Sequence, residues 1–409
     1  MADASLTTFD AVLKTCYGPD FIAEQLNNKN NILERFDKNT EEYEYDGKNF
    51  TFPAHHGRNE GIGSRASGGA LPTASSQSYK EVVIPRKESF GVIKINRDVI
   101  KASNKNSGAF AKVLSTEMKG LVTDLKNDGN RRLFNDGLGT LATCSGAGTS
   151  STAINVDSTR RLRVGQAIDI CVASSGAESH GKLNTTVSSI TSATRFVTAD
   201  AVSAYASLDT TFAVYPYGGH AADNSLGYEP YGLDAIVATT DTITSGYGGL
   251  AVASYAWWIS TLTNHNGALT TLAMQKIVDD TEAAGNGSPS CIVTTSGCVR
   301  AYMEYMEGSR LFTNSMTLDG GIKTSSFTAN GKTLPIIADK YCWEGDMWFL
   351  DESEMVHLVL TDWEWVDDDG GIFKWVSGYD QITAYMAKYD NVACYARNAH
   401  GKLYNVTEA

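Results

Sequence analysis

Two stretches of this sequence could bind a metal ion: the adjacent pair His55-His56 and the acidic run Asp367-Asp368-Asp369-Gly370. Metal-binding histidines need helical or turn spacing and a third ligand nearby. His55-His56 instead precedes a glycine-rich stretch with the composition of an exposed loop. The acidic run starts like a calcium loop, but Gly378 stands where an EF-hand places its glutamate. We therefore expect an exposed histidine pair and a solvated acidic turn, which is at most a weak cation site.

The candidate nucleophiles are equally isolated. Thr295-Ser296-Gly297 lacks the leading glycine of the Gly-x-Ser-x-Gly elbow. Cys291 and Cys298 have no histidine near them in the sequence that could activate a thiol. The glycines of residues 57–63 match neither the P-loop nor the Rossmann fingerprint. We expect no catalytic, metal-binding or cofactor-binding residue, and we interpret the chain as a protein that is not an enzyme.

Composition limits the remaining classes. A chain of 409 residues with 42% hydrophobic residues is long enough for two or three domains with sizeable cores. The formal charge of −13 argues against a sequence-specific nucleic-acid binder, which usually carries a basic stripe, but not against a protein that surrounds nucleic acid. Seven cysteines without a CxxC pair indicate reduced thiols in a cytosol.

No segment of the sequence is expected to enter a membrane. Residues Met1–Lys14 lack the basic and apolar regions of a secretory signal. Ile243–Asn264 is uncharged, but its glycines and hydroxyl residues favour a buried or interface segment over a membrane helix.

The clearest local pattern covers Tyr79–Asn135. Tyr79–Pro85 and Ser89–Ile95 alternate as strands do, and we expect them to pair as a hairpin around Arg86-Lys87-Glu88. Ser107–Asn135 is a predicted amphipathic helix. Apolar residues at spacings of three and four form its predicted core face, which includes Phe110, Leu114, Met118, Leu121 and Leu125.

The rest of the chain predicts a mixed α+β fold with one all-β segment. Residues 138–217 are rich in Ser, Thr, Ala and Gly and contain short alternating runs between turns, which predicts an inserted barrel or sandwich. Helices are expected at Leu269–Ala284 and from about Ser296 to Leu311, and one long strand at Ile382–Ala396. Residues 1–40 form an arm that lies either on its own domain or on a neighbouring copy.

The order of these elements resembles that of the major capsid proteins of tailed bacteriophages with the HK97-type fold. The resemblance covers most of the chain and rests on this order together with five short stretches. These are Glu229-Pro230-Tyr231-Gly232-Leu233, Tyr255-Ala256-Trp257-Trp258, Cys291-Ile292-Val293-Thr294-Thr295-Ser296, Leu334-Pro335-Ile336-Ile337-Ala338-Asp339 and Met347-Trp348-Phe349-Leu350-Asp351.

The resemblance implies a division of the chain along its length. It implies an N-terminal arm (1–51), an extended E-loop hairpin (52–98), a spine helix with peripheral domain (99–137), an inserted all-β domain (138–217), a mainly axial domain (218–345) and a return to peripheral strands (346–409).

The resemblance also implies a function. Pentamers and hexamers of the chain would tile an icosahedral phage head around double-stranded DNA, after assembly in the bacterial cytoplasm. The partners would be further copies of the chain, a scaffolding protein, a portal and, in some phages, a decoration protein. Some family members cross-link an E-loop lysine to a neighbour; Lys80, Lys87 and Lys94 are available here, but no partner can be assigned.

We expect the hairpin to be the part that reaches another subunit, because a two-stranded hairpin without its own core is only marginally stable. Its predicted subunit contacts are Tyr79, Val82, Ile84, Phe90 and Val92.

Three other functions stay open from the sequence. An encapsulin-like shell shares the fold but usually lacks a large β insertion. A glycan-binding surface protein could use Tyr205, Tyr215 and Tyr217 as a stacking platform. A hydrolase would need a site assembled from residues that are distant in the sequence.

Overall fold

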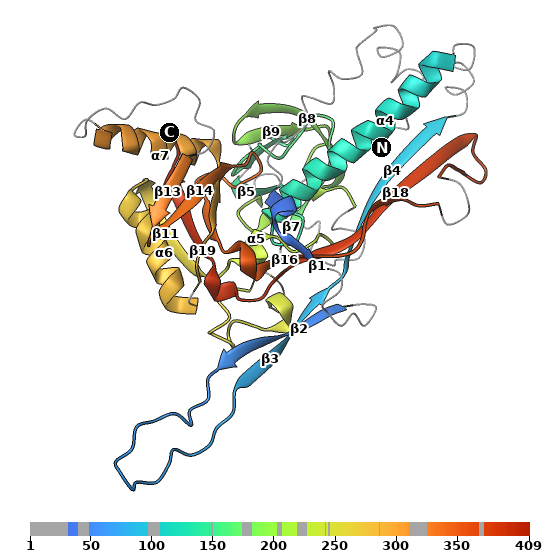
Figure 1. The fold of residues 1–409 in the computed structure, drawn as a ribbon. Coiled ribbons are helices and arrows are strands. Elements are labelled where there is room, and N and C mark those ends of the chain that lie inside the picture. The colour runs from blue at the N-terminus through green and yellow to red at the C-terminus, as the bar shows by residue number, and fades with distance from the viewer. Residues whose placement is uncertain are drawn as a thin grey trace. The chain divides into compact units, whose positions relative to one another are not determined.

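The computed structural model describes residues 32–39, 49–96, 107–146, 148, 150–173, 182–202, 207–218, 227–241, 243, 246–285, 287–310, 325–367 and 372–409. The chain divides into two compact units and passes between them several times (Figure 1). Unit 1 contains Lys87–Gly232 and Val359–Asp390. Unit 2 contains Glu34–Arg86, Leu233–Leu358 and Asn391–Ala409.

Unit 1 is built on a long helix that lies on a sheet. The helix is α4 (Ser107–Leu133), and the strands are β4 (Lys87–Asn96), β16 (Met355–Trp365), β17 (Lys374–Trp375) and β18 (Gln381–Cys394). The ends of β16 and β18 at Met355–Leu358 and Asn391–Cys394 belong to unit 2. Strand β4 pairs antiparallel with β18, from Asn96 opposite Gln381 to Lys87 opposite Asp390. The predicted long strand near the C-terminus is therefore present as β18.

The helix contacts the sheet through the face that its apolar spacing predicts. Met118 and Leu121 pack on Ile93 and Ile95 of β4 together with Trp365 and Ile382, and Leu125 is buried. Gly91 of β4 allows this close approach, since a Cβ there would lie 2.6 Å from Cδ1 of Leu125. The side chains of Phe110 and Leu114 lie outside the described residues, so their place on this face stays a prediction.

Residues 142–216 of unit 1 form a closed barrel in the order β10-β5-β6-β9-β8-β7. Its strands are β5 (Ala142–Gly146), β6 (Ala153–Val156), β7 (Ala167–Val172), β8 (Lys182–Ser192), β9 (Arg195–Thr198) and β10 (Phe212–Pro216). The strands alternate, so that one set of side chains, which includes Ile154, Ile170, Val187, Phe196 and Val214, fills the interior. The sequence left barrel and sandwich open, and the closed order of strands decides for the barrel.

The core of unit 2 is a six-stranded sheet in the order β11-β19-β15-β12-β14-β13. Helices α6 (Thr271–Gly285) and α7 (Ser296–Arg310) pack on it through Met274, Ile277, Cys298 and Tyr302. The strands are β11 (Thr261–Ala268), β12 (Cys291–Thr294), β13 (Ser325–Ala329), β14 (Lys332–Ala338), β15 (Met347–Leu350) and β19 (Gly401–Thr407). The short elements are η1 (Ile32–Arg35), α5 (Leu233–Ile236), η3 (Tyr247–Gly249), η4 (Glu352–Glu354) and η5 (Arg397–Ala399).

Part of the expected N-terminal arm lies on its own chain. Strand β1 (Asp37–Asn39) pairs in parallel with Val356–Leu358 of β16, and Arg35 forms an ion pair of 2.6 Å with Glu352. For residues 32–39, the structure therefore decides between the two positions that the sequence left open. Residues 1–31 lie outside the described residues.

The predicted pairing of the hairpin is wrong. Strand β3 (Ser78–Pro85) pairs with β2 (Asn49–Gly57) and not with β4. The physical reason is that β3 and β4 bury their apolar faces in different units, so they follow one another without folding back. The observed hairpin is β2–β3, with residues 58–77 as its loop.

Residues 346–409, which are expected to return to peripheral strands, are divided between the two units. Strands β15 and β19 pair with each other and belong to the sheet of unit 2, while β17 and most of β18 belong to unit 1. No helix among the described residues is long and apolar enough to span a membrane.

The barrel begins and ends on neighbouring strands, because Ala142 and Thr143 of β5 pair with Val214 and Ala213 of β10. The two ends are thus separated by about 5 Å. We expect that replacing residues 142–216 by a short Gly-Ser linker leaves α4 and its sheet folded, since the linker closes only a short gap. Circular dichroism and thermal unfolding would check this. Loss of the helical signal or of a cooperative transition would show that the barrel is part of the core of unit 1.

Candidate assembly surfaces

The residues that could do chemistry do not form a site. Among the described residues, no group of three or more His, Cys, Asp or Glu side chains could hold a metal ion. Cys144, Cys171 and Cys291 are buried, and burial raises the pKa of each thiol to about 12, so a thiolate nucleophile is disfavoured. Asp367 is described, but Asp368-Asp369-Gly370 lie outside the described residues.

His55 and His56 lie on strand β2 and not in a loop. Neighbouring residues of a strand point to opposite faces, so the two rings cannot share a ligand easily. His55 Nε2 is 2.7 Å from Oε1 of Gln77, and the ring of His56 stacks on Trp257 at a centroid distance of 4.8 Å. Both rings are exposed, as the sequence predicted, and both support the hairpin.

The base of the β2–β3 hairpin is anchored on its own unit. Val82 and Ile84 are fully buried, and a Cβ at Gly248 of η3 would lie 2.3 Å from Cγ1 of Val82. Asn391 Nδ2 donates to the carbonyl of Pro85 at 2.6 Å. Val82 and Ile84 therefore cannot be the subunit contacts that the sequence predicted, because their side chains are already enclosed by their own chain.

The far end of the hairpin has the opposite character. The loop of residues 58–77 continues beyond the paired strands (Figure 1). Ile62 and Leu71 of this loop are 74% and 86% exposed, and Tyr79 at the end of β3 is also exposed. A loop without its own core can bury these two apolar side chains only by lying on another surface.

A second uncovered apolar surface lies on the sheet of unit 1, on the face away from α4. Phe90 and Val92 are each 54% exposed, whereas Ile93 and Ile95, with the opposite parity, pack under the helix. Tyr385 lies opposite Val92 in the register of β18 and is exposed as well. We call Phe90, Val92 and Tyr385 the open sheet face. Phe90 and Val92 remain available as subunit contacts.

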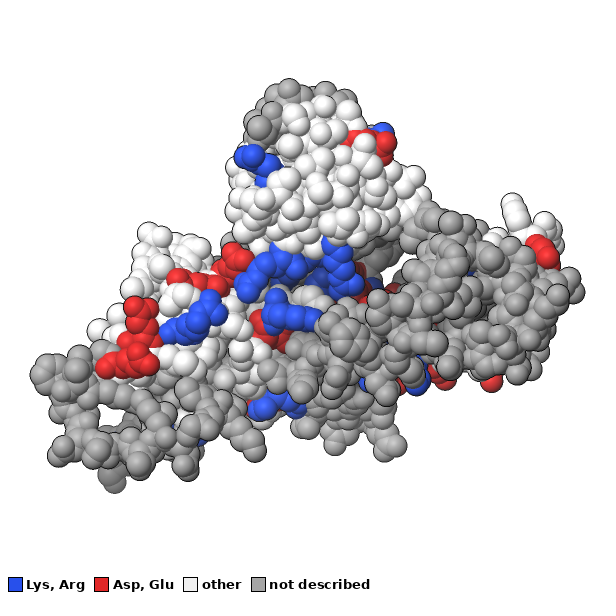
Figure 2. Space-filling view, turned by 90° about the horizontal axis from the view of Figure 1, so that it is seen from above, with Lys and Arg blue, Asp and Glu red and all other residues white. Residues whose placement is uncertain are grey.

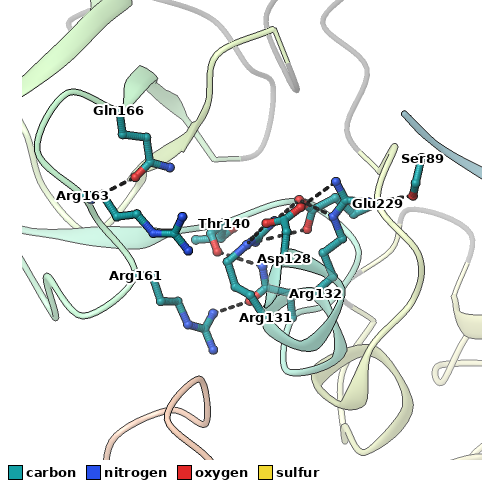
Figure 3. Close-up of polar contacts among 10 residues, drawn as sticks. Ser89, Asp128, Arg131, Arg132, Thr140, Arg161, Arg163, Gln166 and Glu229 are labelled. Carbon is teal, nitrogen blue, oxygen red and sulfur yellow. Dashed lines mark hydrogen bonds and ion pairs between the residues drawn. The ribbon is translucent and has the colours of Figure 1, made fainter. Parts of the chain in front are cut away.

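The C-terminal end of α4 is held by a cluster of ion pairs (Figure 3). Arg131 bonds with Glu229 and, at 2.7 Å, with Asp128. Arg132 also pairs with Asp128 at 2.7 Å and donates to Oγ of Ser89 at 2.6 Å. The cluster thereby joins the helix to β4 and to the segment before Tyr231.

The same end of the helix fixes the barrel. Arg161, from the barrel segment between β6 and β7, donates to Oδ1 of Asn135, whose Nδ2 donates to the carbonyl of Thr140 at 2.9 Å (Figure 3). Arg161 and Asn135 are both buried. A buried charge needs such partners, so this contact holds the barrel in one place relative to the helix end.

The charges of the cluster lower the pKa of Asp128. Burial alone would raise the pKa of Asp128, but the charges and hydrogen bonds of Arg131 and Arg132 outweigh it and hold that pKa well below its usual range. One turn earlier, burial raises the pKa of Asp124, and neighbouring Asp128 adds to this although Arg163 opposes it. The two aspartates therefore have opposite effects on stability.

Asp128→Asn should lower the free energy of unfolding at neutral pH by about 1–3 kcal/mol, less than for a fully buried pair because this carboxylate is 34% exposed. A carboxylate with a lowered pKa stabilises the fold above its ordinary pKa. The wild type should therefore lose this contribution as the pH falls below about 4, and the variant should not. Urea unfolding of wild type and variant at neutral pH and below about pH 4 measures the difference in the free energy of unfolding. Asp124→Asn is the control, with no loss or a small gain expected; equal losses in both variants would contradict the assignment.

Gly232 is the point where the segment after Glu229 touches the helix end. A Cβ at this position would lie 2.4 Å from the carbonyl oxygen of Asn135 and 2.5 Å from those of Arg132 and Leu133. These atoms belong to the backbone and cannot move aside as a flexible side chain can.

Gly232→Ala should therefore destabilise the protein by about 3 kcal/mol or more, through overpacking against the backbone. Gly129→Ala is the matched control, because Gly129 lies inside α4 with open space around it. Its replacement should stabilise the helix by about 0.5–1 kcal/mol. Thermal and urea unfolding measure both. A neutral Gly232→Ala would mean that this close approach is absent.

Figure 2 shows where the charged side chains of the described residues lie on one face. Lys and Arg side chains gather there in a band, but acidic side chains lie among them, and a rounded lobe above carries few charged residues (Figure 2).

Comparison with known proteins identifies the fold. No protein-family model matches the chain, and no curated protein sequence matches it. Among solved structures, the capsid of cyanophage A-1(L) is similar over 92% of this chain and 92% of its own, with a TM-score of 0.55 and 14% identity. The HK97-type capsid fold that the sequence predicted is therefore confirmed.

Two further similar structures have lower TM-scores. The capsid of a native GTA particle matches over 100% of both chains, with a TM-score of 0.49 and 9% identity. An encapsulin complex from Synechococcus elongatus matches over 99% of this chain and 96% of its own, with a TM-score of 0.46 and 10% identity.

Proposed function

We propose that this chain, which has the fold of a phage capsid protein, is the major capsid protein of a tailed phage and assembles as pentamers and hexamers into an icosahedral head. The observation that carries the proposal is the likeness to the cyanophage capsid over 92% of both chains. The proposal also rests on two apolar surfaces that the chain leaves uncovered.

The two surfaces suggest how copies join. The hairpin loop presents Ile62, Leu71 and Tyr79, and the open sheet face presents Phe90 and Val92. They are different patches of one chain, so a contact between them is head-to-tail. Such contacts close into rings when the rotation between copies fits, as pentamers and hexamers require. The anchored base of the hairpin favours this, because the loop then meets the neighbour with little loss of conformational freedom.

The proposal extends to domains and partners. We assign unit 1 with α4 as the peripheral domain, the six-stranded sheet of unit 2 as the axial domain and the barrel as an insertion whose adjacent ends make it separable. The head encloses double-stranded DNA without gripping it, which agrees with the net charge of −13. Scaffolding, portal and, in some phages, decoration proteins are its further partners, and assembly takes place in the bacterial cytoplasm.

Two alternatives remain to be separated. An encapsulin-like shell would use the same contacts but enclose proteins in place of DNA, and the contents of purified particles distinguish the two. A glycan-binding role for the barrel loses support, because Tyr215 is buried while Tyr217 is exposed, so these two do not form one stacking platform. Tyr205 lies outside the described residues.

Phe90→Ser with Val92→Ser should prevent shell assembly, because truncating two exposed anchors weakens each contact between copies by about 2–4 kcal/mol. Electron microscopy and sedimentation of the purified protein measure closed shells and rings. Val164→Ser is the matched control, since Val164 is an exposed apolar residue of the barrel segment, and it should assemble normally. All variants should unfold like the wild type.

Protection from trypsin tests whether the hairpin loop is the surface that contacts Phe90 and Val92 of the neighbouring copy. Arg58 and Arg65 lie in the exposed hairpin loop, so the protease should cut there in unassembled protein and be excluded in shells. Shells that form normally from the Phe90/Val92 double variant, or loops that stay cleavable in shells, would refute the proposed contact. A purified wild type that remains monomeric under all conditions would refute the proposed function itself.

A further inference from the structure

Three asparagines of the sequence are followed by glycine, and the structure describes both residues at Asn266-Gly267 and Asn330-Gly331. This dipeptide is prone to an intramolecular reaction, because glycine has no side chain to hinder its backbone nitrogen from approaching the side-chain carbonyl carbon of the asparagine. Whether the reaction occurs in a folded protein depends on how firmly the asparagine side chain is held.

The two dipeptides have the same exposure class and a similar backbone conformation at the asparagine. Both asparagines are exposed, and both have a left-handed backbone, with φ of 45° at Asn266 and 47° at Asn330. Asn266 lies in β11 at a bulge, where the register with β19 shifts between Asn264 and Gly267. Asn330 lies in the turn between β13 and β14. Exposure and local conformation therefore do not distinguish them.

Their side chains differ in hydrogen bonding. Oδ1 of Asn330 accepts from Nε2 of Gln275 at 2.8 Å, and its Nδ2 donates to Glu282 at 2.8 Å and to Asp279 at 3.3 Å. Within the part of the chain that the structure describes, the amide of Asn266 has no hydrogen-bond partner. Beside it, the ring of His265 donates to the carbonyl of Ala268 at 2.5 Å, which holds the flanking residues but not the amide.

We propose that Asn266 is a site of spontaneous deamidation in the folded protein, and that the hydrogen bonds of Asn330 protect the second site. The nitrogen of Gly267 attacks Cγ of Asn266, a C–N bond forms, and the side-chain nitrogen leaves as ammonia after proton transfer through solvent. Water then opens the five-membered imide at either carbonyl, which gives aspartate or isoaspartate. Amide and water are consumed, a carboxylic acid and ammonia are produced, and nothing is oxidised or reduced.

The reaction changes the strand at a defined place. Each product adds a negative charge to β11, and the isoaspartate product also lengthens the backbone at the bulge. A strand that already contains a bulge can accept the longer isoaspartate backbone more readily than a regular strand. The proposal does not depend on assembly, although a shell that is built once and not renewed would accumulate the product.

The test follows both sites in the intact, full-length protein during incubation at 37 °C and mildly alkaline pH. Peptide mapping by mass spectrometry measures the amide-to-acid mass change in the peptides that contain Asn266 and Asn330. We expect deamidation of Asn266 to be about tenfold faster or more, which corresponds to a barrier difference of about 1.4 kcal/mol. Equal rates, or a faster reaction at Asn330, would overturn the proposal.

Variants separate side-chain restraint from other causes. Gln275→Ala together with Asp279→Ala and Glu282→Ala removes all three hydrogen-bond partners of the Asn330 amide and should raise its rate toward that of Asn266. Gly267→Ala should slow the reaction at Asn266, because the added methyl group hinders the attacking nitrogen. In urea-unfolded protein the two sites should react at similar rates. A rate difference that persists in urea would assign it to the local sequence, against the proposal.

Discussion

The ion pairs around Arg131 are the interaction on which the arrangement of unit 1 depends. A buried guanidinium needs carboxylates close by, because removing one partner leaves a charge in a poorly solvated place. Asp128 and Glu229 supply these carboxylates from the helix itself and from a segment that follows the barrel. The barrel lies between α4 and Glu229 in the sequence, and the ion pairs connect the segment before the barrel with the segment after it. The contact of Arg161 with Asn135 then orients the barrel against the same helix end.

Apolar side chains stay exposed in two places, on the outer face of the β4–β18 sheet and in the hairpin loop, and each exposure has a structural reason. Helix α4 has one apolar stripe and can cover only one face of the β4–β18 sheet, so Phe90 and Val92 stay outside. The buried apolar residues of the hairpin, Val82 and Ile84, lie at its base, where Val82 contacts Gly248. The apolar side chains of its loop, Ile62 and Leu71, are exposed. Soluble monomers rarely expose such patches without use. In the proposed assembly, a neighbouring copy would supply the surface that completes the burial of these side chains.

Most elements could be predicted from the sequence, because their patterns are local. The spacing of Met118, Leu121 and Leu125 predicts the helix and its buried face, and the alternation within residues 142–216 predicts strands in a small β domain. The pairing of strands could not be predicted in the same way. Tyr79–Pro85 and Ser89–Ile95 have the alternation and the short separation of a hairpin. Ser89–Ile95 nevertheless pairs with residues of β18 that lie 287 to 299 positions later in the chain, and Tyr79–Pro85 pairs with β2. The sequence could not separate the buried from the exposed candidates for subunit contact. Only the tertiary structure shows that Val82 and Ile84 are buried while Phe90 and Val92 are exposed.

The sequence by itself predicted an acidic α+β chain whose order of elements matches a capsid fold, and the structure has that fold. These properties depend on composition and on periodicities of a few residues, which survive without knowledge of long-range contacts. Only the tertiary structure decided which strand pairs with which, that the β domain closes as a barrel, and which apolar residues remain exposed. Those outcomes depend on competition between distant segments for the same buried surface. The periodicity of a short segment therefore does not predict which distant segment it will pair with.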